Sequence, residues 1–369
     1  MLCVLSAFAD DLLPSCQSSE IGRYSDIRLR RRVHCAAVFS DFKIEMSTDR
    51  LLASRRLDVA LALVTQGDYA AAAEVAQAAI AADARWDEAH FTLGDIYERA
   101  GEAENAIEAY RQYLILDPID RMGGEVRLTL LGAAAMRDRL PPDYVRALFD
   151  DYAPRFEISL RDRLSYRGPE LLFEAVREQL DAIAGPIEVL DLGCGTGLVA
   201  EVFGGAVDMI DGIDLSPRMI NRAQAKGLYR TLIAGDITAM PDALGTGYGL
   251  VVAADVLNYL GDLAPALRAA HARMKPGGLM VFSLEHGDVF PYDLGPGQRF
   301  RHHERAMDEW LRECGFAVLS DTYGTLRQEK GNPVEGRIMV VRAIDGLDLL
   351  AGDVAQLREQ DLPVAQTIH

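Results

Sequence analysis

The sequence predicts two folds in series, an all-α domain of helical repeats followed by an α/β domain with a doubly wound parallel sheet. A repeat of 34 residues between positions 50 and 120 predicts the helical part. From residue 187 onward, short apolar runs alternate with helical segments, and this alternation predicts a parallel sheet. A glycine-rich loop after the first apolar run indicates that the sheet binds a ligand at the carboxyl ends of its strands.

Composition and charge limit the possible partners. The chain has 369 residues, enough for two or three domains, and 49% of them are hydrophobic. A formal net charge of −18 repels phosphate backbones, so we expect no nucleic acid partner. No apolar run approaches the roughly 20 residues that span a bilayer, and no cysteines or histidines stand at metal-ligand spacing. We expect a cytoplasmic protein with reduced cysteines, no membrane partner and no metal.

Both ends of the chain differ from the rest. Residues 1–45 hold three of the five cysteines and a basic cluster at 28–32, with no period of 2 or 3.6. We expect a poorly ordered extension, translated from a start codon upstream of Met46, and a basic targeting arm is the alternative. Residues 345–369 are acidic and lack strand signals, so we expect a loosely held tail.

The internal repeat defines the first predicted domain, residues 46–140. Identical residues recur at a spacing of 34 in Gly67/Gly101, Ala72/Ala106, Glu74/Glu108 and Asp83/Asp117. This is the length of the tetratricopeptide helix–turn–helix unit. The first copy is degenerate, with Ala84 where the unit ends in proline, and a generic alanine-rich hairpin is the alternative. Two repeats rarely bury their faces alone, so we expect a third helix over Glu125–Leu140 to close the stack.

Residues 143–344 form the second predicted domain. We expect two helices before its first strand, one over Tyr144–Phe156 broken at Pro154 and one over Pro169–Ile183. The continuous apolar runs expected as strands are Ile187–Asp191, Val207–Asp214, Arg230–Ala234, Leu250–Ala254 and Gly278–Leu284. The helices expected after them are Leu198–Phe203, Pro217–Lys226, Ala264–Met274 and Glu304–Cys314, and the closing strands are Phe316–Ser320 and Arg337–Arg342.

The loop after the first strand carries the first candidate binding residues. Asp191 ends the strand, and glycines follow at Gly193, Gly195 and Gly197, where bare backbone lets a ligand approach closely. The third glycine of the dinucleotide fingerprint is missing, and no Gly-Lys-Ser/Thr follows as in a P-loop. A carboxylate here repels a pyrophosphate but suits a ligand with ammonium and sulfonium groups. We interpret Cys194 as a small packing residue beside that ligand.

Two further carboxylates follow the next two strands. Asp214 ends the second strand, where an acidic side chain is placed to accept both ribose hydroxyls. After the third strand, Asp236 could accept an amino proton of adenine while Ile237 packs on the ring. Helix capping is the alternative role for Asp191 and Asp214.

Residues 150–342 resemble the class I S-adenosylmethionine-dependent methyltransferases. The motifs that carry the resemblance are Val189–Gly197, Gly212–Met219, Gly235-Asp236, Asp255–Leu260 and Lys275–Gly278. With the repeats in front, residues 50–342 are similar to the bacterial methyltransferases that contain tetratricopeptide repeats. The resemblance implies the methyltransferase fold, a seven-stranded Rossmann-like sheet whose last strand is antiparallel, with S-adenosyl-L-methionine as cofactor. The Asn/Asp-Pro-Pro-Tyr signature of enzymes that methylate DNA bases at amino groups is absent at 255–259.

The resemblance also implies which residues flank each part of the cofactor. They are Asp191 and the glycine loop for the methionine part, Asp214 for the ribose, with Leu215 and Met219 of the same motif, and Asp236 and Ile237 for the adenine. Asp255 would close the pocket near the sulfonium, and Tyr152 and Phe156 would cover it from the preceding helix.

Methyl transfer from a sulfonium is an in-line displacement, in which the protein mainly holds the reacting groups in line. A base is needed only where the acceptor is protonated. The candidates past the fourth and fifth strands are Tyr259, His286 and His302. An ordinary loop or capping position is the alternative for these histidines and for His303. Arg299 could pair with an acceptor carboxylate or be a satisfied surface arginine.

The sequence thus predicts an enzyme that transfers a methyl group from S-adenosylmethionine to a small molecule or a protein. The repeats would bind a protein partner. The alternative is a repeat-based adaptor whose methyltransferase fold binds the cofactor without reacting.

Overall fold

The computed structural model describes residues 48–160, 164–181, 183, 185–329 and 331–344. The expected extension over residues 1–45, the start at Met46 and the tail over 345–369 lie outside the described residues. Contacts divide the chain into two compact units, Met1–Pro118 and Ile119–His369, and each is described by itself.

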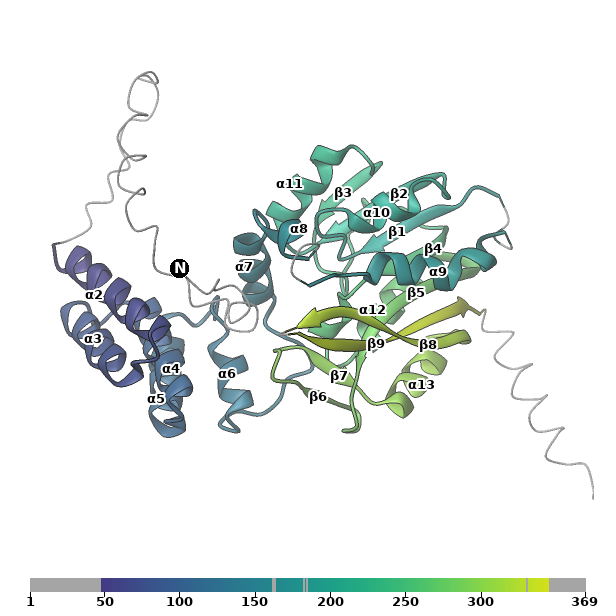
Figure 1. The fold of residues 1–369 in the computed structure, drawn as a ribbon. Helices are drawn as coiled ribbons and strands as arrows, with labels where there is room; N and C mark the ends of the chain where they lie inside the picture. The colour runs from purple at the N-terminus through teal and green to yellow at the C-terminus, as the bar shows by residue number, and fades with distance from the viewer. Residues whose placement is uncertain (1–47, 161–163, 182, 184, 330, 345–369) are drawn as a thin grey trace, which may run out of the picture. The chain divides into compact units, whose positions relative to one another are not determined.

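The first unit contains four described helices, α2 (Thr48–Thr65), α3 (Tyr69–Ala82), α4 (Asp87–Ala100) and α5 (Ala103–Leu116) (Figure 1). Alanines such as Ala72 and Ala76 are fully buried where helices pack together. Gly67 and Gly101, a pair at the 34-residue spacing, both follow a helix with φ of +79°, which favours glycine. The Tyr110 ring packs directly against Gly94, where a Cβ would stand only 2.6 Å from Cε1 of that ring. The repeat spacing therefore corresponds to two successive helix pairs.

The segment after these helices differs from its expectation. The helix expected over Glu125–Leu140 is α6 (Gly124–Leu130), which ends ten residues early and groups with the second unit. Gly132, with φ of +72°, turns the chain after it. Residues 138–140 then form main-chain hydrogen bonds with residues 259–262 of the second unit. Main-chain hydrogen bonds to distant residues thus replace the helix that the apolar period predicts at the end of this segment.

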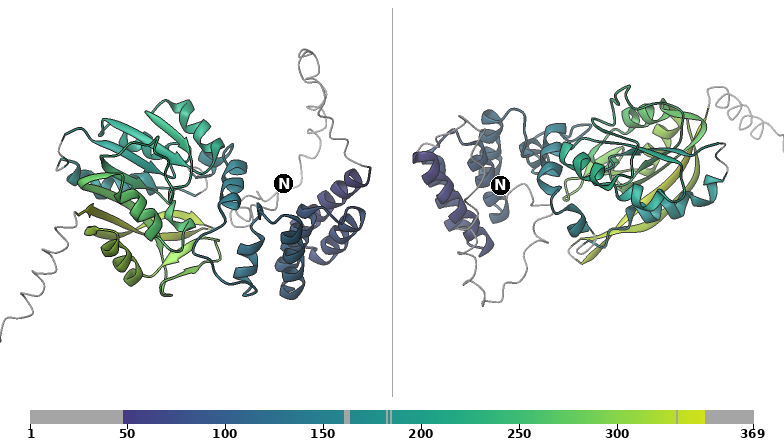
Figure 2. Two further views of the ribbon diagram at one scale, coloured as in Figure 1. Left: turned by 180° about the vertical axis from the view of Figure 1, so that it is seen from behind. Right: turned by 90° about the horizontal axis from the view of Figure 1, so that it is seen from above.

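The second unit is built on one twisted sheet enclosed by helices (Figures 1 and 2). Five strands run parallel in the order β3-β2-β1-β4-β5. They are β1 (Glu188–Leu192), β2 (Met209–Asp214), β3 (Thr231–Ala234), β4 (Tyr248–Ala253) and β5 (Met274–His286). β9 (Asn332–Ala343) pairs antiparallel with β5, and β8 (Phe316–Glu329) pairs antiparallel with β9. These seven strands confirm the predicted fold class, and β8 and β9 extend further than expected.

Two apolar cores lie on opposite faces of this sheet. One includes α9 (Gly168–Leu180) and α10 (Leu198–Phe203), through residues such as Leu172 and Phe203. The other includes α12 (Ala264–His271) and α13 (Glu304–Glu313), through residues such as Leu267 and Met307. The register pairs Asp191 with Gly212 and Asp214 with Ala234, so the carboxyl ends of β1, β2 and β3 share one edge. The predicted binding residues therefore meet at that edge.

A short hairpin is added that the sequence did not predict. β6 (Tyr292–Leu294) pairs with β7 (Phe300–His302), and β7 pairs with the end of β5. Each strand has only three residues, too few for an alternating pattern to show. The hairpin changes the surroundings of His302, which the sequence placed in a loop.

Helices α7 (Pro142–Tyr152) and α8 (Phe156–Ile158) precede the sheet and confirm the break expected around Pro154. Asp150 on α7 accepts hydrogen bonds from Ser216 Oγ at 2.6 Å and Arg218 N at 3.1 Å. Both donors lie at the start of α11 (Pro217–Lys226), so α7 is anchored beside the end of β2. Across the part of the chain with described helices, none is long and apolar enough to cross a bilayer.

Candidate cofactor-binding site

The glycine loop presents bare backbone at the end of β1. Gly193, Gly195 and Gly197 have φ of +67°, +53° and +92°, which side chains rarely adopt. A Cβ on Gly193 would stand 2.3 Å from Val256 Cγ2, so this position has no room for a side chain. The N–H groups of Gly193 and of the next residue donate to Ile213 O at 2.8 and 3.0 Å. The loop is therefore locked to β2, and its glycines follow a backbone path that other residues rarely adopt.

Asp191 is fully buried and lacks a cationic partner among the described side chains. The Tyr229 hydroxyl donates to its Oδ2 at 2.7 Å, whereas Oδ1 has no partner in the described part of the chain. Burial raises the pKa of this carboxyl to about 7. Among the described residues, only the Tyr229 hydroxyl donates to this carboxylate and no helix N–H does, so the capping alternative is not supported. The orphaned oxygen is suited to a ligand that donates a hydrogen bond or carries positive charge.

Asp214 ties the end of β2 to the glycine loop. Its Oδ2 accepts from Gly195 N at 2.9 Å and its Oδ1 from Ser216 N at 2.8 Å. Burial raises its pKa to about 6. The cap of α11 is Ser216, whose hydroxyl accepts from Met219 N, so Asp214 is not the capping residue of that helix. Its half-buried neighbour Leu215 and the buried Met219 line the same turn.

Asp236 lies two residues after β3 and is held on both oxygens. Oδ1 accepts from Thr238 N at 2.9 Å and Thr238 Oγ1 at 2.7 Å, and Oδ2 accepts from Arg139 Nη2 at 2.6 Å. Burial alone would raise the pKa of this carboxyl, but these hydrogen bonds hold it below its usual value. Ile237 next to it is buried in the core. The sequence offers no local signal for Arg139, which is 97 residues from its partner.

A series of packed aromatic side chains begins beside the glycine loop. Phe156 lies 3.7 Å from the position of a Gly195 Cβ, as its predicted covering role requires. Its ring packs edge-on against Tyr152, with centroids 5.5 Å apart. Phe149 packs against both Phe156 and Tyr259. Burial raises the pKa of Tyr259 to about 12, so this hydroxyl stays protonated and can donate a hydrogen bond at neutral pH.

A cluster of buried and half-buried charged side chains lies near the ends of β4, β5 and β8. It comprises the carboxylates Asp255, Glu285 and Glu329 and the guanidinium groups of Arg299 and Arg327. Arg327 donates to Asp255 Oδ2 at 2.9 Å and also to Glu285, and Arg299 Nε donates to Glu285 at 2.6 Å. Arg299 is thus engaged by protein carboxylates rather than exposed for an acceptor. Arg327, which organises the cluster, lies in a strand extension that the sequence did not predict.

The three histidines at and after the end of β5 occupy different surroundings. His302 is buried on β7, its Nε2 donates to Leu260 O at 2.8 Å, and burial lowers its pKa to about 4. This imidazole is enclosed, its Nε2 is held by a main-chain carbonyl and its lowered pKa makes it a weak base, so its surroundings do not favour His302 as the general base. His286, at the end of β5, is exposed, with Nε2 3.6 Å from Asp288 Oδ1. His303 caps α13 by accepting from Arg305 N at 3.1 Å, as the capping alternative stated.

Further polar atoms without partners support a ligand at this edge. Among the described side chains, Thr196 Oγ1 in the glycine loop and Asn258 Nδ2 after β4 are both buried without a hydrogen bond. Cys194 is buried, and burial raises the pKa of its thiol, which agrees with a packing role. No cluster of His, Cys, Asp and Glu within the described ranges has the arrangement of a metal site.

Comparisons with known proteins identify both parts of the chain. A family model described as a methyltransferase domain matches residues 164–321, and one described as a tetratricopeptide repeat matches residues 57–120. Malonyl-[acyl-carrier protein] O-methyltransferase of Pseudescherichia vulneris is 32% identical over 98 residues, 27% of this chain and 39% of that protein. A ubiquinone biosynthesis O-methyltransferase of Cereibacter sphaeroides is 27% identical over 168 residues, 43% of this chain and 65% of that protein.

Solved structures with similar chains include two methyltransferases. Magnesium protoporphyrin IX methyltransferase of Synechocystis, with bound SAH, is 17% identical with a TM-score of 0.42, over 55% of this chain and 99% of that one. A Burkholderia thailandensis 1,6-didemethyltoxoflavin-N1-methyltransferase is 20% identical with a TM-score of 0.43, over 57% and 94%. The matches to the two curated relatives above span less than two thirds of their lengths. The family matches confirm the predicted resemblance to methyltransferases over residues 164–321 and to tetratricopeptide repeats over residues 57–120.

Proposed function

We propose that this protein transfers a methyl group from S-adenosylmethionine to a small-molecule or protein acceptor. The observation that carries the proposal is the orphaned, buried Oδ1 of Asp191 beside a loop whose three glycines have positive φ. A cationic ligand with hydrogen-bond donors satisfies both features. Bound S-adenosylmethionine would supply an electrophilic methyl group on a sulfonium.

The residues at the sheet edge suit the parts of this cofactor in order. Asp191 and the glycine loop would hold the methionine part, and Asp214 the ribose hydroxyls. Asp236 and Ile237 would hold the adenine, and Asp255 would stand near the sulfonium. The set proposed around them comprises Gly193, Cys194, Gly195, Gly197, Leu215, Met219 and Tyr152.

The protein contributes mainly orientation to the chemistry. Tyr152, Phe156 and Tyr259 exclude water from the loop side, and alignment of reacting groups can be worth about 7–11 kcal/mol. Tyr259, held protonated, would donate a hydrogen bond to the acceptor. His286 is the sequence candidate whose exposure allows it to take a proton from an acceptor. Several similar curated proteins are named O-methyltransferases, so oxygen acceptors are the first class to test.

The repeat unit and the location of the protein complete the proposal. Tetratricopeptide repeats bind protein segments in many proteins, so we propose a protein partner for residues 57–120. We place the protein in the cytoplasm. The alternative, an adaptor that binds cofactor without reacting, is not favoured, because Asp191, Asp214 and the loop glycines are all in place.

Calorimetry with S-adenosylmethionine and S-adenosylhomocysteine tests the site. Asp214→Ala should weaken binding by roughly 1–3 kcal/mol, as expected for lost hydrogen bonds to a charged group. Asp208→Ala is the matched control, because Asp208 accepts from Ile187 N at the opposite end of β1. Equal affinities of the two variants would refute the ribose assignment.

Transfer of isotopically labelled methyl into a cell extract tests turnover. Label should appear in the small-molecule or the protein fraction, and the RNA fraction serves as the negative control. Tight cofactor binding with no label in any fraction would favour the adaptor.

A further inference from the structure

A short segment before the matched methyltransferase domain reaches the adenine end of the proposed site. We call residues 138–140 the strap. It runs antiparallel to Leu260, and three main-chain hydrogen bonds of 2.7–3.0 Å join it to residues 259–262. The Tyr292 hydroxyl also donates to Asp138 Oδ1 at 2.8 Å. The strap is therefore fixed to the turn that follows β4.

Arg139 extends from the strap to the carboxylate after β3. Its Nη2 donates to Asp236 Oδ2 at 2.6 Å and its Nη1 to Thr238 Oγ1 at 3.1 Å. Thr238 donates twice to the other oxygen of Asp236. A carboxylate oxygen accepts about two hydrogen bonds, so Oδ1 is filled while Oδ2 can accept one more. The Asp236 side chain is 28% exposed, which leaves a ligand access to it.

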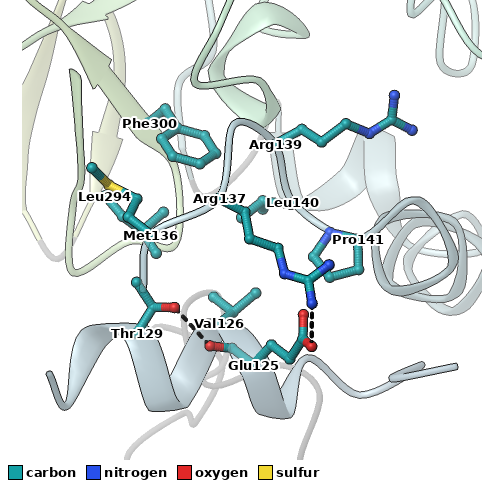
Figure 3. Close-up of a pocket in the computed structure, with 10 residues that line it drawn as sticks. All are labelled: Glu125, Val126, Thr129, Met136, Arg137, Arg139, Leu140, Pro141, Leu294 and Phe300. Carbon is teal, nitrogen blue, oxygen red and sulfur yellow. Dashed lines mark hydrogen bonds and ion pairs between the residues drawn. The ribbon is translucent and has the colours of Figure 1, made fainter. Parts of the chain in front are cut away.

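The neighbouring arginine of the same segment behaves differently. Arg137 lines a small pocket between α6 and the β6–β7 hairpin and pairs with Glu125 (Figure 3). Arg139 lies at the rim of that pocket, and its side chain points away from it. Two arginines two residues apart thus serve opposite sides of one segment, and Arg137 provides an internal control.

We propose that Arg139 is a positioning residue for adenine recognition. This inference rests on the proposed function and extends it to a residue outside the matched domain. Arg139 holds Asp236 so that the remaining acceptor direction of Oδ2 meets the 6-amino group of adenine. A carboxylate bound on one oxygen only would keep more side-chain freedom, which binding would then have to remove.

The role of Arg139 predicts a dependence on the base itself. Adenine donates a hydrogen bond from its 6-amino group, whereas hypoxanthine presents a carbonyl oxygen there, which a carboxylate does not bond. The placement of Asp236 therefore affects an adenine ligand and has little effect on a hypoxanthine ligand. General damage to the fold would weaken both ligands alike.

The experiment is calorimetry of the full chain with S-adenosylhomocysteine and S-inosylhomocysteine. Arg139→Ala should weaken binding of S-adenosylhomocysteine by about 5- to 10-fold, the size of one ordinary hydrogen bond, and change binding of S-inosylhomocysteine by less than about 2-fold. Arg139→Lys should recover part of the loss. Arg137→Ala should bind both ligands as the wild-type protein does.

A double-mutant cycle separates action through Asp236 from a direct effect. In the Asp236→Ala background, Arg139→Ala should cause no further loss, because the residue it positions is gone. Additive losses would overturn the inference, as would equal weakening of both ligands or an Arg139→Ala variant that matches Arg137→Ala. If a thermal melt shows that Arg139→Ala is unfolded, Arg139→Gln replaces it as the test variant. It must weaken binding of S-adenosylhomocysteine more than binding of S-inosylhomocysteine, and an unchanged ratio of the two affinities refutes the inference. Failure of the wild-type chain to bind S-adenosylhomocysteine overturns the proposed function itself.

Discussion

Two groups of carboxylates at the same edge of the sheet differ in how their charge is balanced. Asp191 and Asp214 form no ion pair with a described side chain, and burial raises the pKa of these carboxyls to about 7 and about 6. The other group, Asp255, Glu285 and Glu329, shares two buried arginines, Arg299 and Arg327. Burial without a counter-charge disfavours ionisation, whereas pairing favours it.

The difference indicates where a ligand contributes charge. A buried carboxylate without a counter-charge lowers the stability of the fold, so we expect one where a bound ligand supplies the missing charge. A cationic cofactor beside Asp191 is such a compensation. The paired group is already neutralised for the most part, and its arginines connect the ends of β4, β5 and β8. The contrast supports the proposed role of Asp191 and Asp214 in ligand binding, and it indicates that the arginines of the second group hold the surrounding strand ends together.

The largest expected effect comes from breaking the paired group. Arg327→Met leaves up to three carboxylates short of a partner in the interior and should lower the free energy of unfolding by about 3–5 kcal/mol. Arg146→Met removes an exposed ion pair with Asp143 and should change it by less than about 1 kcal/mol. Urea unfolding of the wild-type protein and the two variants measures both changes in the free energy of unfolding. Similar values for the two variants would mean that the cluster does not hold the pocket.

Neutralising the unpaired group should have the opposite effect on the free protein. Asp191→Asn should leave the cofactor-free protein as stable as the wild type or more stable at pH 8, because it removes a buried charge. Its affinity for S-adenosylmethionine should fall by about 1–3 kcal/mol. Tyr229→Phe keeps the carboxylate and should retain most of the affinity. Loss of stability in Asp191→Asn with intact binding would reverse the assignment of the two groups.

The pH dependence of binding sharpens the same comparison. The raised pKa of Asp191 means that its contribution to stability is present below pH 3.8 and is lost as the pH rises through about 7. A cation binds the ionised form, so affinity for S-adenosylmethionine should move the other way and rise by about 10-fold from pH 6 to pH 8. Calorimetry across this range measures the slope. Asp191→Asn should reduce the slope to the smaller part that comes from Asp214, whose pKa is raised to about 6, and an unchanged slope would place the titrating group elsewhere.

The smallest expected effect is removal of the repeat unit, which supplies no residue to either carboxylate group. A chain that starts at Ile119 should bind S-adenosylmethionine within about 2-fold of the full chain, less than 0.5 kcal/mol. A chain that starts at Pro141 loses Arg139 and should bind more weakly. Equal affinity of the two truncated chains would contradict a role for the strap, and a loss in the longer one would implicate the repeats in cofactor binding.

Much of the site could be predicted because its signals are local. The residue before the glycine loop, the end of the second strand and the turn after the third each carry a carboxylate at a recognisable distance from an apolar run. Parallel strands bring such positions to one edge without further information. The position of Phe156 was implied only by the family resemblance, and the structure places its ring beside Gly195.

What the sequence by itself determined is therefore the order of elements and the carboxylates at the strand ends, which follow from patterns within a few residues, and the repeat, which shows as identical residues 34 positions apart. Only the tertiary structure decided that Arg139 meets Asp236, that Arg327 joins Asp255 to Glu285, and that the β6–β7 hairpin buries His302. The physical reason is that these pairings join residues 42 to 97 positions apart. A side chain's partner at that distance depends on how whole elements pack, and no local period encodes it.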